Sequence, residues 1–241
     1  MNDITHQMEE QEILSWKKLI RVINHEIMNS MTPIITLSMA IRKKLAKGNQ
    51  AKPVEQLPSE ALDDAIHSAS IIEERSKGLV QFIERYKKLT GLPPMKMERF
   101  PAGDLFAKME QLFKEELNAK DIRFNWPSQC NAELEADQQM LEQVLINLVK
   151  NSVEALRNQE DPAIELSCYR DADNHICLAV HDNGEGIPED KLEQVFVPFF
   201  TTREEGSGIG LSLCRQIIRS HHGRTEIEST PEEGTRVVIT L

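Results

Sequence analysis

The sequence contains no long apolar run, no paired-cysteine motif and no excess of positive charge. No stretch approaches the roughly 20 apolar residues that a membrane-spanning helix needs, and the polar, acidic N-terminus is unlike a signal peptide. The four cysteines share no C-x-x-C spacing, which argues against a zinc ribbon or a disulfide scaffold. The net charge of −11 disfavours a nucleic-acid-binding surface. We therefore expect a reduced, cytoplasmic chain with no membrane span of its own and no nucleic-acid partner.

The chain divides into two regions that differ in charge. Hydrophobic residues make up 40% of it and charged residues 28%, which are ordinary proportions for a globular protein. Residues 1–94 carry 13 Lys and Arg against 12 Asp and Glu, whereas the remaining residues carry 15 against 27. This shift, together with Pro93-Pro94, predicts two domains that comprise residues 1–94 and 95–241.

Apolar residues in the first region recur at steps of three and four, which is the spacing of a helix with one apolar face. Within residues 9–45 they are Ile13, Trp16, Ile20, Ile23, Ile27, Ile34, Leu37 and Ile41. A second stretch between Leu62 and Tyr86 repeats the spacing, with Ser59 as its expected N-cap and Gly91 to Pro94 as its end. Two helices hide only part of these faces, so we expect a helical hairpin that pairs with a second copy into a four-helix bundle.

The second region alternates β-like and helical patterns. The expected strands cover residues 163–169, 176–182, 225–229 and 235–241, and the expected helices cover residues 102–119, 137–157 and 208–221. Strands interleaved with helices in this way predict a two-layer α/β sandwich, which makes the fold class of the whole chain α+β. The pair His221-His222 has no carboxylate or cysteine at ligand spacing, and we interpret it as the polar end of the last helix.

The segment from Asp182 to Pro188, with the sequence DNGEGIP, directly follows a predicted strand. Its two glycines, Gly184 and Gly186, allow the backbone to turn sharply and to approach a ligand without a Cβ in the way. A carboxylate at the end of the strand can accept a hydrogen bond from a donor such as an exocyclic amine. Taken alone, the segment is equally compatible with an ordinary turn.

A second glycine-rich segment, GSGIGLSL at residues 206–213, leads into a predicted helix. Unpaired N–H groups and the positive end of the helix dipole make such a segment a ready anion site. The Walker pattern is absent, and no strand precedes the segment as a Rossmann fingerprint would require. Taken alone, it is as compatible with a helix-entry loop as with a phosphate site.

Two asparagines lie four residues apart in the predicted helix of residues 137–157. Asn147 and Asn151 therefore share one face of an otherwise apolar helix, although asparagine is a mediocre helix former. Amide oxygens are hard ligands that suit Mg²⁺. Either asparagine alone is equally compatible with a surface amide.

Along the chain, the helix with the two asparagines comes first, DNGEGIP second and GSGIGLSL third. In this order they resemble the N, G1 and G2 boxes, respectively, of the ATP-binding fold that histidine kinases share with gyrases and mismatch-repair ATPases. Residues 195–200, with the sequence VFVPFF, resemble the F box of this family, and Gly234-Thr235 resembles its closing Gly-Thr element. The motifs spread in order over roughly the last 145 residues, which makes the resemblance far more specific than any single box.

The resemblance implies ATP and Mg²⁺ as ligands. It implies that Asp182 binds the adenine amino group, that Asn151 ligates Mg²⁺, and that Asn147 lies beside the phosphates. Thr201-Thr202-Arg203 matches the start of the family's lid, with Arg203 where lysine is more usual. The other residues implied to bind nucleotide are Gly184, Gly186, Ile187, Gly206, Gly208, Gly210, Leu211 and Thr235.

The first predicted helix carries a histidine on the side away from its apolar seam. The segment from His25 to Asn29, with the sequence HEIMN, resembles the H box of dimeric histidine kinases, especially the HExxNPLxP pattern of nitrogen-regulation-type sensors. Ser30 stands where that pattern has its first proline, and Pro33 is retained. A lone exposed histidine is otherwise an ordinary solvated side chain.

Together the resemblances imply the core of a sensor histidine kinase of a two-component system. ATP would phosphorylate His25, with Glu26 as general base, and an aspartate of a response regulator receiver domain would receive the phosphoryl group. Asn29 is implied to belong to a phosphatase element that acts on that regulator. The chain could be the cytoplasmic part of a membrane-anchored sensor. The alternative is a pseudokinase, a catalytically silent dimeric scaffold that binds nucleotide.

Overall fold

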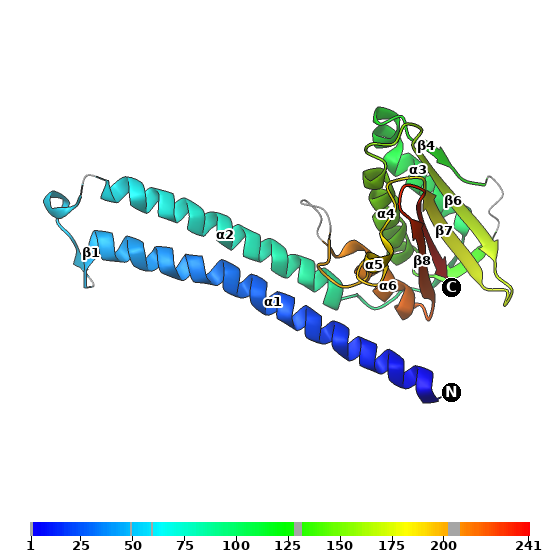
Figure 1. The fold of residues 1–241 in the computed structure, drawn as a ribbon, viewed down its shortest axis with the longest axis horizontal. Coiled ribbons are helices and arrows are strands. Elements are labelled where there is room, and N and C mark those ends of the chain that lie inside the picture. The colour runs from blue at the N-terminus through cyan, green and yellow to red at the C-terminus, as the bar shows by residue number, and fades with distance from the viewer. Residues whose placement is uncertain (1, 49, 59, 128–131, 202–207) are drawn as a thin grey trace. The chain divides into compact units, whose positions relative to one another are not determined.

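The chain folds into two compact units, Met1–Lys87 and Lys88–Leu241 (Figure 1). The computed structural model describes residues 2–48, 50–58, 60–127, 132–201 and 208–241, without the side chains of residues 2–19, 22, 54, 85 and 88–90. Ser59, the expected N-cap, therefore lies outside the described residues. Within the described part, no helix combines the length and the apolar character that a membrane crossing requires.

The first unit is the expected helical hairpin. Its helices are α1 (Asn2–Leu45) and α2 (Ala61–Thr90), and α1 continues through Pro33. Between them lie a small antiparallel pair, β1 (Ala46–Lys47) with β2 (Gln50–Ala51), and the 3-10 turn η1 (Val54–Gln56). The ammonium group of Lys52 donates hydrogen bonds of 3.0 and 2.8 Å to the carbonyls of Lys43 and Lys44, so it caps the C-terminal end of α1.

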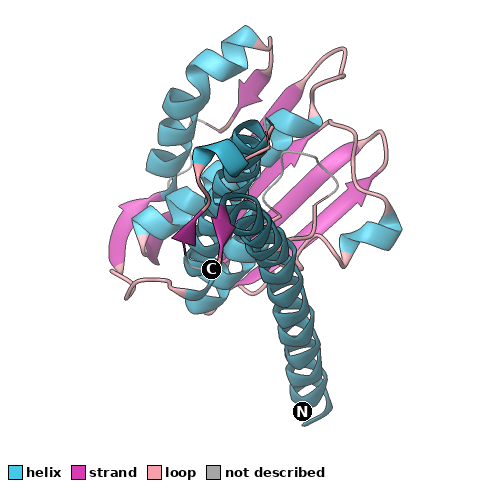
Figure 2. Cartoon of the chain, turned by 90° about the vertical axis from the view of Figure 1, so that its left-hand side faces the viewer, coloured by secondary structure: helices cyan, strands magenta, loops and turns pink. Residues whose placement is uncertain are grey.

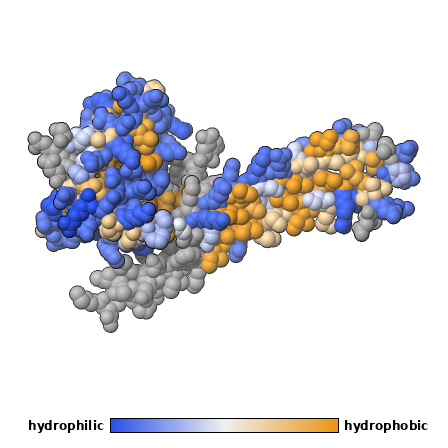
Figure 3. All heavy atoms as spheres, turned by 180° about the vertical axis from the view of Figure 1, so that it is seen from behind, coloured by the Kyte–Doolittle hydropathy of each residue, from blue (hydrophilic) through white to orange (hydrophobic). Residues whose placement is uncertain are grey.

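Among its described side chains, the hairpin buries few and leaves much apolar surface in contact with solvent. Ala61, Ala65 and Phe82 are buried in this unit. The large apolar side chains that stay exposed are Ile20, Ile27, Met28, Met31, Ile35, Met39, Leu62, Ile66, Val80 and Ile83. Figure 3 shows apolar residues gathered along one face of the two helices. Met31, Ile35 and Met39 on this face lie outside the predicted seam, so α1 has a broader apolar surface than the single predicted stripe.

The second unit is the expected two-layer sandwich of a sheet and helices. Its sheet has the order β4-β6-β7-β9-β8, in which β4 is parallel to β6 and all other neighbours are antiparallel. These strands are β4 (Arg123–Asn125), β6 (Ala163–Arg170), β7 (Ile176–Asp182), β8 (Arg224–Thr230) and β9 (Gly234–Thr240). The four predicted strands are confirmed, and β4 is a short addition at the edge.

Three helices cover one face of this sheet (Figures 1 and 2). They are α3 (Ala102–Ala119), α4 (Gln138–Ala155) and α6 (Gly210–Ser220), and a short helix α5 (Glu189–Leu192) lies between β7 and α6. β3 (Glu98–Pro101) and β5 (Glu133–Ala136) form a separate antiparallel pair. In the chain, β3 directly precedes α3 and β5 precedes α4. The fully buried core side chains come from the helices and the sheet, and include Leu105, Phe106, Leu141, Leu145, Ile164, Leu178, Ile217 and Ile239.

Candidate functional site

Asp182 is a buried carboxylate at the end of the central strand β7, with only 4% of its surface exposed. The hydroxyl of Ser152 on α4 donates to its Oδ2 atom at 2.7 Å, and the backbone N–H of Gly184 donates to Oδ1 at 3.1 Å. Burial raises the pKa of Asp182 above its ordinary value, although these two hydrogen bonds act in the opposite direction. The carboxylate is therefore held in one orientation between the sheet and α4.

The loop after Asp182 is fitted closely against the end of α4. A Cβ atom on Gly184 would lie 2.7 Å from the carbonyl oxygen of Ala155, the last residue of that helix. The backbone N–H of Glu185 donates to the same carbonyl at 3.2 Å. Only glycine at position 184 allows this approach, so the first predicted glycine has a definite packing role.

The far side of the same loop is fastened to the turn between β8 and β9. Gly186 has a φ of +67°, and a Cβ there would lie 2.1 Å from the carbonyl oxygen of Thr230. The backbone N–H of Ile187 donates to the hydroxyl of Ser229 at 2.8 Å, which in turn contacts the hydroxyl of Thr235 at 2.8 Å. The G1 loop and the closing Gly-Thr element are thus brought together.

On α4, Asn147 faces the first turn of α6. Its Oδ1 atom accepts a hydrogen bond of 3.5 Å from Gln143, one turn earlier on the same face. Its Nδ2 atom is buried, and the thiol of Cys214 on α6 interacts with this side chain. A Cβ on Gly210 would lie 3.8 Å from Cγ of Asn147, so the N box and the G2 box lie side by side. Asn151, one turn further along α4, is half-buried.

The F box packs against the entry to α6. The backbone N–H of Phe199 donates to the carbonyl of Gly208 at 2.7 Å, and Gly208 has a φ of +65°. The guanidinium of Arg215 lies 4.3 Å from the ring centre of Phe196, a distance at which a cation attracts an aromatic face. Among the expected nucleotide-binding residues, Thr201 is exposed and Leu211 is half-buried, and Thr202, Arg203 and Gly206 lie outside the described residues.

In the first unit, the side chain of His25 is 72% exposed on α1. Its Nδ1 atom lies 2.9 Å from Nδ2 of Asn29 and 3.9 Å from Oε1 of Glu26, so the amide is the closer partner. An amide N–H that donates to Nδ1 leaves the ring proton on Nε2, whereas a ring proton on Nδ1 would require the amide oxygen as its partner. The orientation of the Asn29 amide is therefore linked to which ring nitrogen carries the proton.

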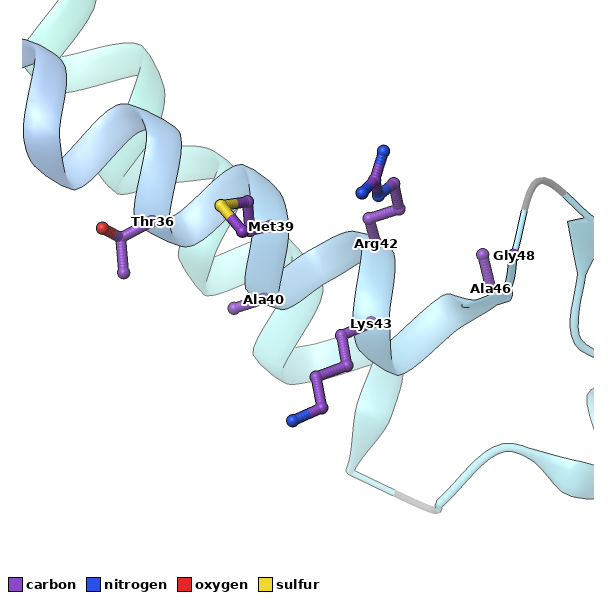
Figure 4. Close-up of a pocket in the computed structure, with 7 residues that line it drawn as sticks. All are labelled: Thr36, Met39, Ala40, Arg42, Lys43, Ala46 and Gly48. Atoms are coloured by element: carbon purple, nitrogen blue, oxygen red, sulfur yellow. The ribbon is translucent and has the colours of Figure 1, made fainter.

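The surface of the hairpin is hollowed near the C-terminal end of α1. Figure 4 shows the residues that line this hollow, which are Thr36, Met39, Ala40, Arg42, Lys43, Ala46 and Gly48. None of the predicted nucleotide-binding residues belongs to it.

Sequence reasoning missed two side chains that shape the nucleotide loops. Ser152 lies next to the expected Mg²⁺ ligand Asn151, yet a serine inside a helix gives no sign that it will bond a carboxylate 30 residues away. Ser229 ends a predicted strand and joins the loop at Ile187 to Thr235. Both roles depend on pairing between distant strands and helices.

Comparison with known proteins identifies the class to which this second unit belongs. Residues 136–241 match the family of histidine kinase-, DNA gyrase B- and HSP90-like ATPases. The nucleotide-free catalytic domain of the histidine kinase ThkA is 33% identical, with a TM-score of 0.54, over 61% of this chain and 95% of that domain. The whole chain is similar to ThkA in its complex with the response regulator protein TrrA, at 25% identity and a TM-score of 0.61, over 66% of that chain.

Sporulation kinase D of Bacillus subtilis is 28% identical over 219 residues, which are 90% of this chain and 40% of that protein. The chain spans 16%, 27% and 50% of the length of three other curated relatives. The second unit is thus an ATPase domain of this class. The chain belongs to the histidine kinases.

Proposed function

We propose that this chain is the kinase core of a sensor histidine kinase. It would transfer the γ-phosphoryl group of ATP to His25 and then pass it to an aspartate of a response regulator receiver domain. The observation that carries the proposal is that one chain combines an exposed H-box histidine with the assembled N, G1 and G2 boxes of a histidine kinase ATPase domain. The ThkA complex with a response regulator supports the choice of partner.

Asp182 and Asn147 would recognise the two ends of the nucleotide. An ionised carboxylate only accepts hydrogen bonds, so Asp182 can take one from the exocyclic amine of adenine. Asn147, which lies against Gly210 at the start of α6, is proposed to lie beside the phosphates. The amide oxygen of Asn151 is the kind of hard ligand that suits Mg²⁺, which when bound would neutralise charge on the phosphates. Thr201, Thr202 and Arg203 are proposed as the start of the lid, and Gly206 as part of the G2 box, on resemblance alone.

At His25, the lone pair of Nε2 would attack the γ-phosphorus while the bond to the bridging oxygen breaks and ADP leaves. This requires the ring proton to lie on Nδ1 beforehand. The amide of Asn29 must then present its oxygen to Nδ1. Glu26, whose Oε1 lies 3.9 Å from Nδ1, would take that proton as positive charge develops on the ring.

Incubation of the purified chain with γ-labelled ATP and Mg²⁺ tests the proposal. We expect label that is lost in acid and retained in alkali, because a phosphohistidine is acid-labile, and we expect a receiver domain to remove it. A chain that binds nucleotide but gains no acid-labile label would instead be the catalytically silent scaffold. None of the described residues favours that alternative.

The chain is further proposed to act as a homodimer, because the apolar face of its hairpin is uncovered in one copy. Ile35 is 51% exposed on α1, on that face. Ile35→Lys should weaken dimerisation on the order of a hundredfold or more, because a dimer would then have to bury an unpaired charge. Sedimentation across a concentration series measures this. Thr32→Lys adds the same charge to an exposed polar position and should leave the dimer intact; a monomeric wild-type chain would contradict the proposal.

The contact between Asn29 and His25 supports a second activity, removal of phosphate from the regulator. An amide can hold an attacking water through its donor and its acceptor without being consumed. The substrate for the test is the receiver domain that the kinase labels fastest. Asn29→Ala should slow the loss of phosphate from this domain by about ten- to hundredfold. Autophosphorylation should change less, because Glu26 remains beside the ring.

The decay of the phosphorylated receiver is followed with wild-type chain, Asn29→Ala and the exposed control Thr32→Ala. Equal decay with all three proteins would mean that Asn29 takes no part in dephosphorylation.

A further inference from the structure

Helices α4 and α6 pack antiparallel, and three contacts along them define their register. Gly210, at the start of α6, lies against Asn147. The thiol of Cys214, one turn later, donates to the carbonyl of Val144 at 3.7 Å. At the far end, the ring of His221 reaches the backbone of Asp137, the N-cap of α4. Residue numbers rise along α6 as they fall along α4. The contact between His221 and Asp137 therefore lies at the other end of the helix pair from Gly210 and Asn147.

His221 uses both ring nitrogens in this contact. Its Nε2 atom accepts a hydrogen bond of 3.0 Å from the backbone N–H of Asp137, and its Nδ1 atom lies 2.8 Å from the carbonyl oxygen of Ile217. These partners require a neutral ring with its proton on Nδ1. Because Asp137 is only 7% exposed, its N–H would be a buried donor without a partner if the ring were removed.

The carboxylate of Asp137 strengthens the same junction. It accepts hydrogen bonds from the backbone N–H groups of Met140 at 3.0 Å and Lys96 at 2.8 Å. Burial alone would raise the pKa of Asp137, but these backbone hydrogen bonds lower it, so the group is held as an anion. The N-terminus of α4, the C-terminal end of α6 and the segment before β3 therefore meet at one rigid point.

We propose that His221 is a positioning residue for nucleotide binding, which sets the register of α6 on α4 and thereby the placement of Gly210 beside Asn147. The inference rests on the proposed function of the site. His221 is eleven residues from Gly210 along α6, about 16 Å at 1.5 Å per residue, so it acts through the helix and not by touching the ligand. Loosening this end lets α6 shift along α4, and a shift of one residue moves Gly210 by about 1.5 Å.

The test uses substitutions that distinguish the contribution of Nε2 of His221 from that of Nδ1. The amide of glutamine reaches the position of Nε2, whereas the amide of asparagine reaches only that of Nδ1. We expect His221→Leu and His221→Asn to raise the dissociation constant of a non-hydrolysable ATP analogue with Mg²⁺, and the KM for ATP, by about tenfold. The kcat at saturating ATP should change little, and His221→Gln should restore most of the affinity.

The matched control is His222→Asn, at the next position, which is exposed and has a φ of +61° that asparagine tolerates. It should bind the analogue as the wild-type chain does. If His221→Leu binds with unchanged affinity, or if His221→Gln is as weak as His221→Asn, the role of His221 is overturned. A wild-type chain that binds no analogue would overturn the proposed function itself. Should His221→Leu fail to fold, the Gln and Asn variants decide by the same comparison.

Discussion

His25→Gln is expected to abolish acid-labile phosphorylation of the chain while leaving its affinity for ATP unchanged. Glutamine keeps polarity and approximate size but has no ring nitrogen whose lone pair could attack phosphorus. The side chain of His25 is largely exposed on α1 and belongs to a different unit from the nucleotide loops, so its removal should not alter them. Label retained after alkali, together with the dissociation constant of an ATP analogue, measures both halves of this result.

His67→Gln provides the matched control, because His67 is another exposed histidine, on α2 of the same hairpin. It should be phosphorylated like the wild-type chain. Phosphorylation of His25→Gln at the wild-type rate would show that the acceptor is a different residue. Loss of nucleotide affinity in the same variant would show that nucleotide binding depends on the hairpin.

The regular parts of the fold could be predicted because they are repetitive in the sequence. Steps of three and four define both hairpin helices, and alternating β-forming residues define β6 to β9. The short strands β3, β4 and β5 were missed, because three or four residues carry too little periodicity and their pairing is decided by the rest of the unit. The breadth of the apolar face on α1 was also underestimated, since Met31, Ile35 and Met39 fall outside the predicted seam.

In the candidate site, too, residues in a local motif could be predicted, whereas their partners from distant parts of the sequence could not. Asp182 and the glycines around it were found because a motif presents them in order along the chain. The partners that fix them could not be found in this way: Ser152 is 30 residues from Asp182, and His221 is 84 residues from Asp137. His221 was interpreted only as the polar end of a helix. A hydrogen bond between distant segments leaves no periodic signal, so only the folded arrangement reveals it.

Asp182→Asn should reduce affinity for an ATP analogue by on the order of a hundredfold or more. The two carboxylate oxygens already accept from Ser152 and from the N–H of Gly184. Asparagine offers one oxygen and one NH₂ group, so either the NH₂ group faces the N–H donor of Gly184, or the Ser152 hydroxyl has to turn from donor to acceptor. The remaining oxygen would have to serve both a protein donor and the adenine amine. Calorimetric titration of the purified chain with the analogue and Mg²⁺ measures the loss.

Two controls separate this effect from general damage. Ser152→Ala keeps the carboxylate but removes one donor, so its loss of affinity should be smaller, about tenfold. Asp173→Asn changes an exposed carboxylate in the turn between β6 and β7 and should have no effect. Near-wild-type affinity of Asp182→Asn would mean that the carboxylate does not recognise the base.

The raised pKa of Asp182 adds a pH dependence with a defined sign. Protonation turns one carboxylate oxygen into a donor, so that this oxygen can no longer accept a hydrogen bond from the amine of adenine. Because burial raises the pKa, the carboxylate is lost at a higher pH than an exposed aspartate would be. Affinity for the analogue should therefore fall as the pH is lowered through that raised pKa, and recover above it. Asp182→Asn has no such proton to gain, so its weak binding should be flat over the same range. A wild-type chain with equally flat affinity would show that Asp182 stays ionised throughout, or that the base is recognised elsewhere.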